Sequence, residues 1–459
     1  MTLDKHFCVA LLLGMVLPTP SVRAQAEEYR FSLDFGYRWK TATLGSQDLY
    51  RSQLDYGEGP KLFSGDLSVS RQNRFFDHLE VRFNSWGGEP YNSARVRSFK
   101  RGVYELHFDY LNVQYFNAIP FFANPLLEKG DLRSQHKYDI SQRLVRFSLR
   151  LRPGKRISPF FSYQRVTRQG PVRTTLSADG DEFLLDAATD NHSDDLRAGV
   201  EFRIPRFTLR LEQGFRWFRD ETRYRASGFQ EGNSTRSIFG REITLDQYNG
   251  RNDVQVSIPF STAAAVFEPD DSLSLSARIS YGIADLDSDF SESSRGTFFS
   301  FPPLAIFYGG GERQAGGEAR RPSLFGDFSA AWRASPRFRL IERFQLRRFH
   351  VSGSVLDDLT FDQVEPLLGS QPDPLRSSSF LARFLSMDID IQEFQGVFYP
   401  ISRLQLRAGH RFEHKKVRSN GARFTWDQNV FTAGAAYDFS RANRISLEYE
   451  LGRTDRPLL

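Results

Sequence analysis

Apolar and polar residues alternate one by one along many stretches of the chain. In GVYELHFDY, residues 102–110, apolar and aromatic side chains occupy every second position, and charged or titratable ones lie between them. The same two-residue period runs through RFSLRLR (146–152), SLSLSARISYGIA (272–284) and RISLEYELG (444–452). Because successive side chains of a β-strand point to opposite faces, this period predicts strands with one apolar and one polar face.

Comparable runs recur to the end of the chain, and no apolar stripe of helical period competes with them. We predict a nearly all-β chain of about 18–20 antiparallel strands. Short clusters of Pro, Gly, Ser, Asn or Asp separate pairs of runs, at 152–156, 203–207, 267–272, 334–338, 399–403 and 439–444. Longer polar connections are expected at 170–193, 221–241, 285–324 and 350–378, the third including the glycine-rich loop GGGERQAGG (309–317).

The alternation of short turns with long connections places all short turns at one end of the sheet and all long loops at the other. Soluble sandwiches have shorter strands and do not sort their loops in this way. A membrane-spanning barrel has strands of at least about 9–11 residues, alternating faces and short turns at one end. We therefore predict that residues 27–459 form a single large antiparallel transmembrane β-barrel.

In such a barrel the apolar positions face lipid and the charged positions face a wet lumen. The candidate lipid-facing residues are Tyr104, Leu106, Phe108, Tyr110, Leu273, Leu275, Ile279, Tyr281, Ile445, Leu447 and Tyr449. The candidate lumen-lining residues are Glu105, His107, Asp109, Arg146, Arg150, Arg210, Glu212, Arg278, Arg407, Glu448 and Glu450. Both signs of charge occur on the lumen side, so no strong ion selectivity is expected.

The amino-terminal residues 1–26 are typical of a secretory signal peptide. A basic start precedes the apolar run FCVALLLGMVL, and small residues allow cleavage after Ala24 or Ala26. The chain has one cysteine, Cys8, inside this segment, so the mature chain has no disulfide and no thiolate metal site. Export and strand-based membrane insertion together predict the outer membrane.

Composition adds further limits. Mean hydropathy is −0.47 and charged residues make up 25% of the chain, which argues against a helical membrane protein. Aromatic residues reach 14%, which argues against a disordered chain. The net charge is +5 and arginines are scattered along the chain, so nucleic acid is not an expected partner.

No motif for catalysis or cofactor binding is found. Nucleophile-elbow, phosphate-loop, dinucleotide and zinc-protease signatures are all missing from the sequence. His410 and His414 share a strand face but lie two pleats apart, which makes a poor metal site. We expect no enzyme activity, no metal and no cofactor held by this chain.

Two segments, YRSQLDYGEGPKLFSGDLSV (50–69) and YNSARVRSFKRGVYELHFDY (91–110), resemble the MtrB/PioB family of outer-membrane barrels. The resemblance covers residues 29–125 in detail and the rest in architecture. It implies a barrel that acts as a sheath around a periplasmic multihaem cytochrome, so that electrons cross the outer membrane.

Two other functions fit the same pattern. One is a passive, porin-like channel for small solutes. The other is a secreted soluble all-β protein with a carbohydrate-binding or adhesive role, in which the apolar positions would pack between two sheets.

Overall fold

The computed structural model describes residues 28–40, 45–71, 73–88, 90–118, 136–234, 237–300, 306–364, 375–440 and 443–455. The predicted signal peptide, residues 1–26, lies outside them. The elements are β1 (Glu28–Arg38), α2 (Gln47–Gln53), β2 (Gly59–Ser70), β3 (His78–Trp86), β4 (Tyr91–Lys100), β5 (Tyr104–Asn117), β6 (Lys137–Leu151), β7 (Ile157–Ala178), β8 (Asp181–Ile204), β9 (Phe207–Gln230), β10 (Thr244–Asp270), β11 (Leu273–Ser300), β12 (Ile306–Ser335), β13 (Phe338–Val364), β14 (Leu375–Ile401), β15 (Leu404–Ser419), β16 (Ala422–Asp438) and β17 (Arg444–Asp455).

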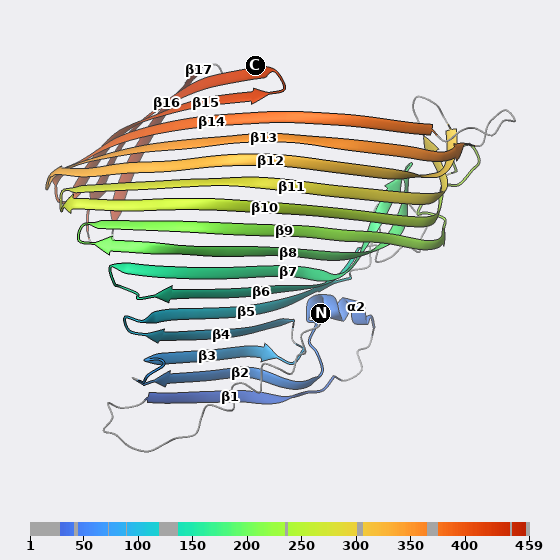
Figure 1. The fold of residues 1–459 in the computed structure, drawn as a ribbon, viewed down its shortest axis with the longest axis horizontal. Coiled ribbons are helices and arrows are strands. Elements are labelled where there is room, and N and C mark those ends of the chain that lie inside the picture. Colours follow the sequence, from blue (N-terminus) through green and yellow to red (C-terminus); the bar gives the residue numbers. More distant parts are fainter. Residues whose placement is uncertain are drawn as a thin grey trace.

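All strands belong to one sheet of 17 strands, which confirms the predicted all-β, antiparallel fold. Each strand pairs with the next one in the chain, from β1–β2 to β16–β17, and every pair is antiparallel. Figure 1 shows the result as a strongly curved meander with β1 and β17 at opposite margins. The described strands number 17, slightly fewer than the 18–20 expected from the sequence.

One end of the sheet has only short connections, as the sequence predicts, but short connections also follow β3, β7, β11 and β15 at the other end, where the sequence predicts only long loops. Every connection from an even-numbered strand to the next strand has seven residues or fewer, and those after β8, β10, β12 and β14 have two. We call this the turn end; it lies at the left in Figure 1. All intervals of ten residues or more separate odd-numbered strands from the next strand, so they fall at the opposite, far end.

The strands β7 to β14 are far longer than the sequence suggested, at 22 to 30 residues each. The prediction of long loops at 170–193 and 285–324 is wrong for most of their length, because these residues extend β7, β8, β11 and β12. The glycine-rich segment 309–317 is a paired part of β12 rather than a loop. At 221–241 and 350–378, β9 continues to Gln230 and β13 to Val364.

The physical reason lies in the local composition. Apart from the apolar run Phe183–Leu185, these extensions carry mostly polar side chains on both faces, so they lack the alternation by which a strand is recognised. Their backbone groups are still paired in a regular antiparallel ladder, for example Asp287 opposite Glu318 and Gly317 opposite Val355. A strand extension with water on both faces needs no apolar face, because the adjoining part of the same strand already fixes its register with the neighbouring strands.

One extension ends in a turn that the sequence does encode. Asp179 and Gly180 join β7 to β8, and both have positive φ, 52° and 84°. Positive φ at both central residues is the type I′ hairpin geometry, for which Asp-Gly is a favoured pair. The segment 170–193 was therefore recognisable as a hairpin from its turn alone.

Candidate functional site

The register divides the sheet into two faces of opposite chemistry. Between β5 and β6, Leu106 lies opposite Leu149 and Phe108 opposite Phe147, whereas Glu105 lies opposite Arg150. We call the side of Leu106 the apolar face and the side of Glu105 the polar face. The alternation in residues 102–110 thus sorts correctly into two faces.

The polar face collects every predicted lumen-lining residue. Following cross-strand partners from Glu105 leads to Arg150, Phe160, Gly199 and Glu212. Each paired position lies on the same face as its partner, and the same procedure connects the remaining strands. The residues that share this face are Glu105, His107, Asp109, Arg146, Arg150, Arg210, Glu212, Arg278, Arg407, Glu448 and Glu450.

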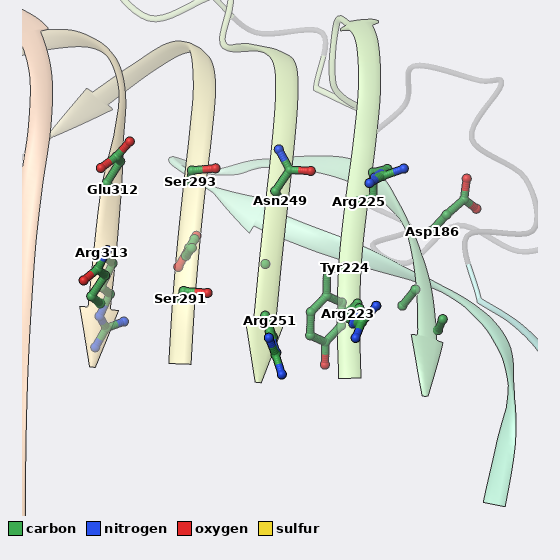
Figure 2. A pocket seen from close by; sticks show the side chains of 15 residues that line it. Asp186, Arg223, Tyr224, Arg225, Asn249, Arg251, Ser291, Ser293, Glu312 and Arg313 are labelled. Atoms are coloured by element: carbon green, nitrogen blue, oxygen red, sulfur yellow. The ribbon is translucent and has the colours of Figure 1, made fainter. Parts of the chain in front are cut away.

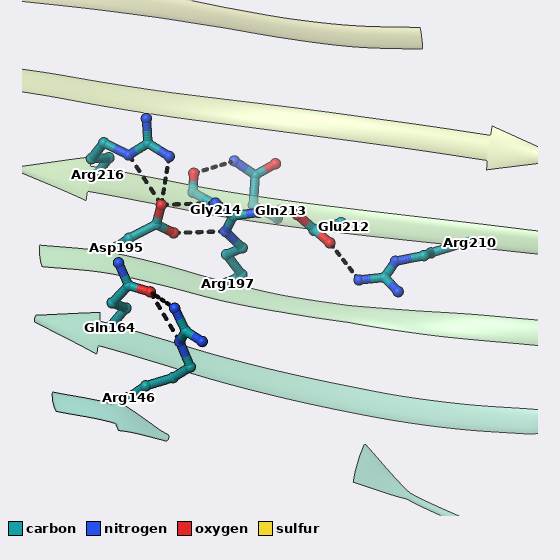
Figure 3. A network of polar contacts seen from close by, with 9 residues as sticks. All are labelled: Arg146, Gln164, Asp195, Arg197, Arg210, Glu212, Gln213, Gly214 and Arg216. Carbon is teal, nitrogen blue, oxygen red and sulfur yellow. Dashed lines mark hydrogen bonds and ion pairs between the residues drawn. The ribbon is translucent and has the colours of Figure 1, made fainter. Parts of the chain in front are cut away.

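A network of charged side chains crosses the polar face from β8 to β9 (Figure 3). The Asp195 carboxylate accepts hydrogen bonds from Arg197, at 2.7 and 2.8 Å, and from Arg216, at 2.6 and 3.0 Å. Arg197 also lies 3.5 Å from Glu212, which pairs with Arg210 at 2.8 Å. The side chains of Asp195 and Glu212 are only 13% and 10% exposed, so the arginines cover both carboxylates.

Similar pairs continue across the same face. The Asp109 carboxylate accepts a hydrogen bond from Arg95 at 2.8 Å, and the Asp327 carboxylate accepts one from Arg343 at 2.6 Å. Arg407 forms an ion pair with Glu448 at 2.8 Å. On β6 and β7, two guanidinium nitrogens of Arg146 donate to the Gln164 side chain at 3.1 and 3.0 Å. The polar face is therefore charged, but close neighbours neutralise the paired charges. Such a surface suits contact with water and has no strong preference for either sign of ion.

Sequence reasoning found Arg210 and Glu212 but missed Asp195, Arg197 and Arg216. The sequence does carry the alternation here, since Asp195 and Arg197 alternate with Leu196 and Ala198. What the sequence does not give is the register that places Arg216 opposite Asp195.

The apolar face collects every predicted lipid-facing residue. From Leu273 on β11, successive cross-strand partners are Trp332, Leu340, Gly396, Ala408, Ala433 and, on β17, Tyr449. The residues predicted for this face are Tyr104, Leu106, Phe108, Tyr110, Leu273, Leu275, Ile279, Tyr281, Ile445, Leu447 and Tyr449, and all lie on it.

The apolar character is concentrated in a band next to the turn end, although Leu356, Phe380 and Phe384 lie on the same face beyond it. The band covers residues 207–217 of β9, 273–283 of β11 and 338–346 of β13, and we call it the apolar band. Its side chains are exposed rather than packed against a second layer: Ile279 is 43% and Leu447 is 74% exposed. An exposed apolar surface of this extent marks contact with a membrane or with another protein.

Beyond the band, at the far end, the tip of the β7–β8 hairpin folds over the polar face. Phe183 and Leu185 are buried there with Tyr248 and Phe298 in one cluster, and Figure 1 shows the hairpin ends crossing neighbouring strands. The Asp179 carboxylate accepts a hydrogen bond from the Phe299 amide at 2.7 Å, which ties the tip to β11. We call the cluster the far-end cap.

Burial in the cap changes the acidity of its phenols. It raises the pKa of Tyr308, which packs against the cluster, to about 12, because ionisation would place a charge among apolar side chains near Asp179 and Glu292. Burial also raises the pKa of Tyr248.

A hollow of about 620 Å³ lies beyond the apolar band on the side of the apolar face (Figure 2). Arg223, Arg225 and Arg251 line it together with Asp186 and Glu312. Arg223 lies 2.5 Å from Glu221 and Arg251 3.1 Å from Asp253, so charges of both signs meet there as well. The hollow is an open groove on the side of the apolar face and is not part of the polar face.

The described part of the chain offers neither a metal site nor a helical membrane span. There, no group of three or more His, Cys, Asp or Glu side chains is placed to hold a metal ion. No helix in the described ranges is long and apolar enough to cross a membrane.

Comparison with known proteins finds no matching family model and no matching curated protein. Solved structures that are similar include the ferric-catecholate import receptor Fiu from E. coli K12 in its open form (10% identity, 87% of this chain, 72% of that chain, TM-score 0.31). They also include the ferric yersiniabactin uptake receptor FyuA from Yersinia pestis (10% identity, 83% of this chain, 67% of that chain, TM-score 0.38). A third is the RagAB peptide importer (9% identity, 90% of this chain, TM-score 0.40), of which this chain spans 55%. At this level of similarity the matches assign neither a family nor a substrate.

Proposed function

We propose that the chain is an outer-membrane β-barrel that encloses a polar conduit. The observation that carries the proposal is the pairing of two faces on one sheet: an apolar band of about 9–11 residues per strand, and an ion-paired polar face behind it. In this arrangement lipid covers the exposed apolar side chains, and water fills the space in front of the charged ones. Closure of the curved sheet into a ring is part of the proposal, because hydrocarbon leaves no unpaired strand edge.

The two faces give each predicted residue a role in the proposal. Glu105, Asp109 and Arg146 belong to the wall of the conduit, whereas Leu106 and Ile279 contact acyl chains. The protein carries out no chemistry; the wall supplies a fixed, neutralised polar surface. Residues 1–26 direct export to this location and are then removed.

The soluble alternative explains the structure less well. A secreted sandwich or adhesion module would cover its apolar positions with a second sheet. The described residues form one sheet, and apolar-face side chains such as Phe31 and Leu447 remain 69% and 74% exposed. Water is a poor solvent for a surface of this kind, whereas lipid is a good one.

The long strands favour one version of the conduit. A 28-residue strand such as β11 is about 90 Å long, whereas an outer-membrane apolar band is only about 25 Å tall. The wall therefore continues far beyond the membrane, which a passage for small solutes does not require. A wall of this length suits an elongated resident partner, and the resemblance of residues 29–125 to the MtrB/PioB family implies a periplasmic multihaem cytochrome.

Purification from native outer membranes tests both versions. The sheath version predicts a haem-staining protein that co-purifies with the chain and no conductance in planar bilayers. The passive channel predicts steady conductance and no haem. Recovery of the chain from the periplasm or medium as a soluble protein would contradict both versions.

A further inference from the structure

The pairing of charges on the polar face is incomplete over five neighbouring strands, β12 to β16. One row of cross-strand partners starts from Ser280 of β11, on this face, and continues through Phe325, Arg347, Ile389, Lys415 and Trp426. The adjacent row, nearer the far end, starts from Ser323 and continues through Phe349, Met387, Val417 and Phe424. Arg321 follows Ser323 on the same face of β12, again toward the far end. We call Arg321 and the two rows, without Ser280 and Ser323, the basic–aromatic patch.

Each of the three cations in the patch lies over an aromatic ring of the patch. The distances from the charged group to the ring centre are 5.9 Å for Arg347 over Phe325, 4.8 Å for Arg321 over Phe349 and 4.3 Å for Lys415 over Trp426. The negative face of a ring attracts a cation but does not cancel its charge. The rings therefore hold the three cations in place and leave them able to attract an anion.

Within the described part of the chain, none of the three cations forms an ion pair with a carboxylate. Arg347 donates one hydrogen bond, to the Gln345 side chain at 3.3 Å. The Asp327 carboxylate, on the same face of β12, pairs with Arg343 at 2.6 Å instead. Even with Glu413 beside Lys415 on β15, the patch keeps an excess of positive charge.

The extent and composition of the patch suit contact with a protein. Five strands at a spacing of about 4.8 Å make it about 19 Å wide. Ile389 and Met387 place apolar side chains among the cations, and the Phe424 ring is 45% exposed. Arginine, methionine and aromatic side chains are enriched in protein contact surfaces, whereas small molecules bind in concave pockets.

We propose that the basic–aromatic patch is the contact surface for an acidic segment of a protein that resides in the conduit. Carboxylates of this segment pair with Arg321, Arg347 and Lys415, and its apolar side chains cover the aliphatic part of the patch. The charge complementarity selects an acidic occupant, because a basic segment would meet like charges there. The inference rests on the proposed function, since it takes the polar face as the wall of a conduit with a resident partner.

Two fluorescent peptides of equal length, polyglutamate and polylysine, test the patch. Their binding to the full-length protein, expressed alone and purified in a nonionic detergent, is followed by fluorescence anisotropy. We expect polyglutamate to bind at least about tenfold more tightly than polylysine. The triple variant R321Q/R347Q/K415Q should weaken the binding of polyglutamate by about tenfold or more.

The matched control is the triple variant R320Q/R348Q/K416Q. Each of its positions is the sequence neighbour of a patch cation and points to the apolar face of the same strand. It removes the same net charge from the same three strands, so it should change the binding of polyglutamate by less than about twofold. Equal losses in the two triple variants would overturn the patch.

A second measurement does not depend on the folding of either triple variant. Polyglutamate that carries a nitroxide should quench the tryptophan fluorescence of the unmodified protein, and W426F should remove most of this quenching. Equal binding of the two peptides, or quenching that persists in W426F, would overturn the proposal. Displacement of polyglutamate by free glutamate at an equal concentration of carboxylates would indicate a site for small anions and would also overturn it. None of these results affects the barrel itself, which the heat-dependent gel shift described below tests separately.

Discussion

At the scale of single residues, the polar wall depends on covered carboxylates. The Asp195 carboxylate accepts hydrogen bonds from Arg197 and Arg216. The Glu212 carboxylate lies between Arg197 and Arg210 and pairs with both. Removing one charge from such a network leaves its partners without compensation in a partly covered place. A single exposed ion pair contributes far less.

The network yields a stability prediction. We expect D195A to lower the free energy of unfolding by about 1–3 kcal/mol, because two guanidinium groups lose their shared acceptor. The measurement is urea-induced unfolding in lipid vesicles, followed by tryptophan fluorescence. D287A is the control, since Asp287 lies opposite Glu318 and should cost little. Equal effects of the two substitutions would remove the network as a source of stability.

The assignment of faces gives a second residue-scale prediction. Ile279 and Ser280 are neighbours on β11 that point to opposite faces. I279R should destabilise the protein in a bilayer by about 2–4 kcal/mol, whereas S280R, on the wet side, should change stability by less than about 1 kcal/mol. Refolding yield and urea unfolding of both variants in vesicles measure the difference. If S280R were the more damaging substitution, the two faces would be assigned the wrong way round.

At the scale of elements, the sequence predicts strands well wherever one face is apolar. Residues 102–110, 272–284 and 444–452 all form strands with the expected faces. It fails where both faces are wet, as in 285–300 and 309–317, because composition there no longer distinguishes a strand from a loop. The register between strands cannot be predicted from the sequence either, because no residue near Asp195 indicates that Arg216 lies opposite it.

The turn end and the far end should lie on opposite sides of the membrane. Outer-membrane barrels keep short turns in the periplasm, so the far end should be outside. We expect an epitope inserted between Asn420 and Gly421, in the β15–β16 turn, to bind antibody on intact cells. The matched epitope between Ser402 and Arg403, in the β14–β15 turn, should bind only after the outer membrane is permeabilised. The reverse pattern would invert the orientation.

The far-end cap should respond to strongly alkaline pH. Its folded state keeps Tyr308 protonated up to a pKa of about 12, whereas an exposed tyrosine ionises near its ordinary value of about 10. The folded state therefore holds more protons between these two values, and the cap loses stability as pH rises from about 10 to 12. Below pH 10 the stability from this group is constant.

Absorbance of tyrosinate together with limited proteolysis tests this behaviour. Cleavage within residues 174–187 should increase over that pH interval in the unmodified protein, and Y308F should move the onset of cleavage to higher pH. Cleavage that begins at the same pH in both proteins would show that Tyr308 does not govern the opening of the cap.

At the scale of the whole molecule, the 17 described strands form one sheet with two incompatible surfaces, and no second layer within the described ranges separates these surfaces from water. The apolar band needs lipid, and the charged face needs water. A closed barrel in a membrane satisfies both and pairs the backbone throughout. The extensions beyond the band add length to the polar path, and the cap covers part of its far end.

The most direct test of this account is electrophoretic mobility in SDS with and without boiling, performed on fractionated membranes. A closed barrel resists SDS at room temperature, so the chain should be found in the outer-membrane fraction and should migrate as a compact band that shifts on boiling. A chain that is recovered in a soluble fraction and migrates identically before and after boiling would contradict the central claim.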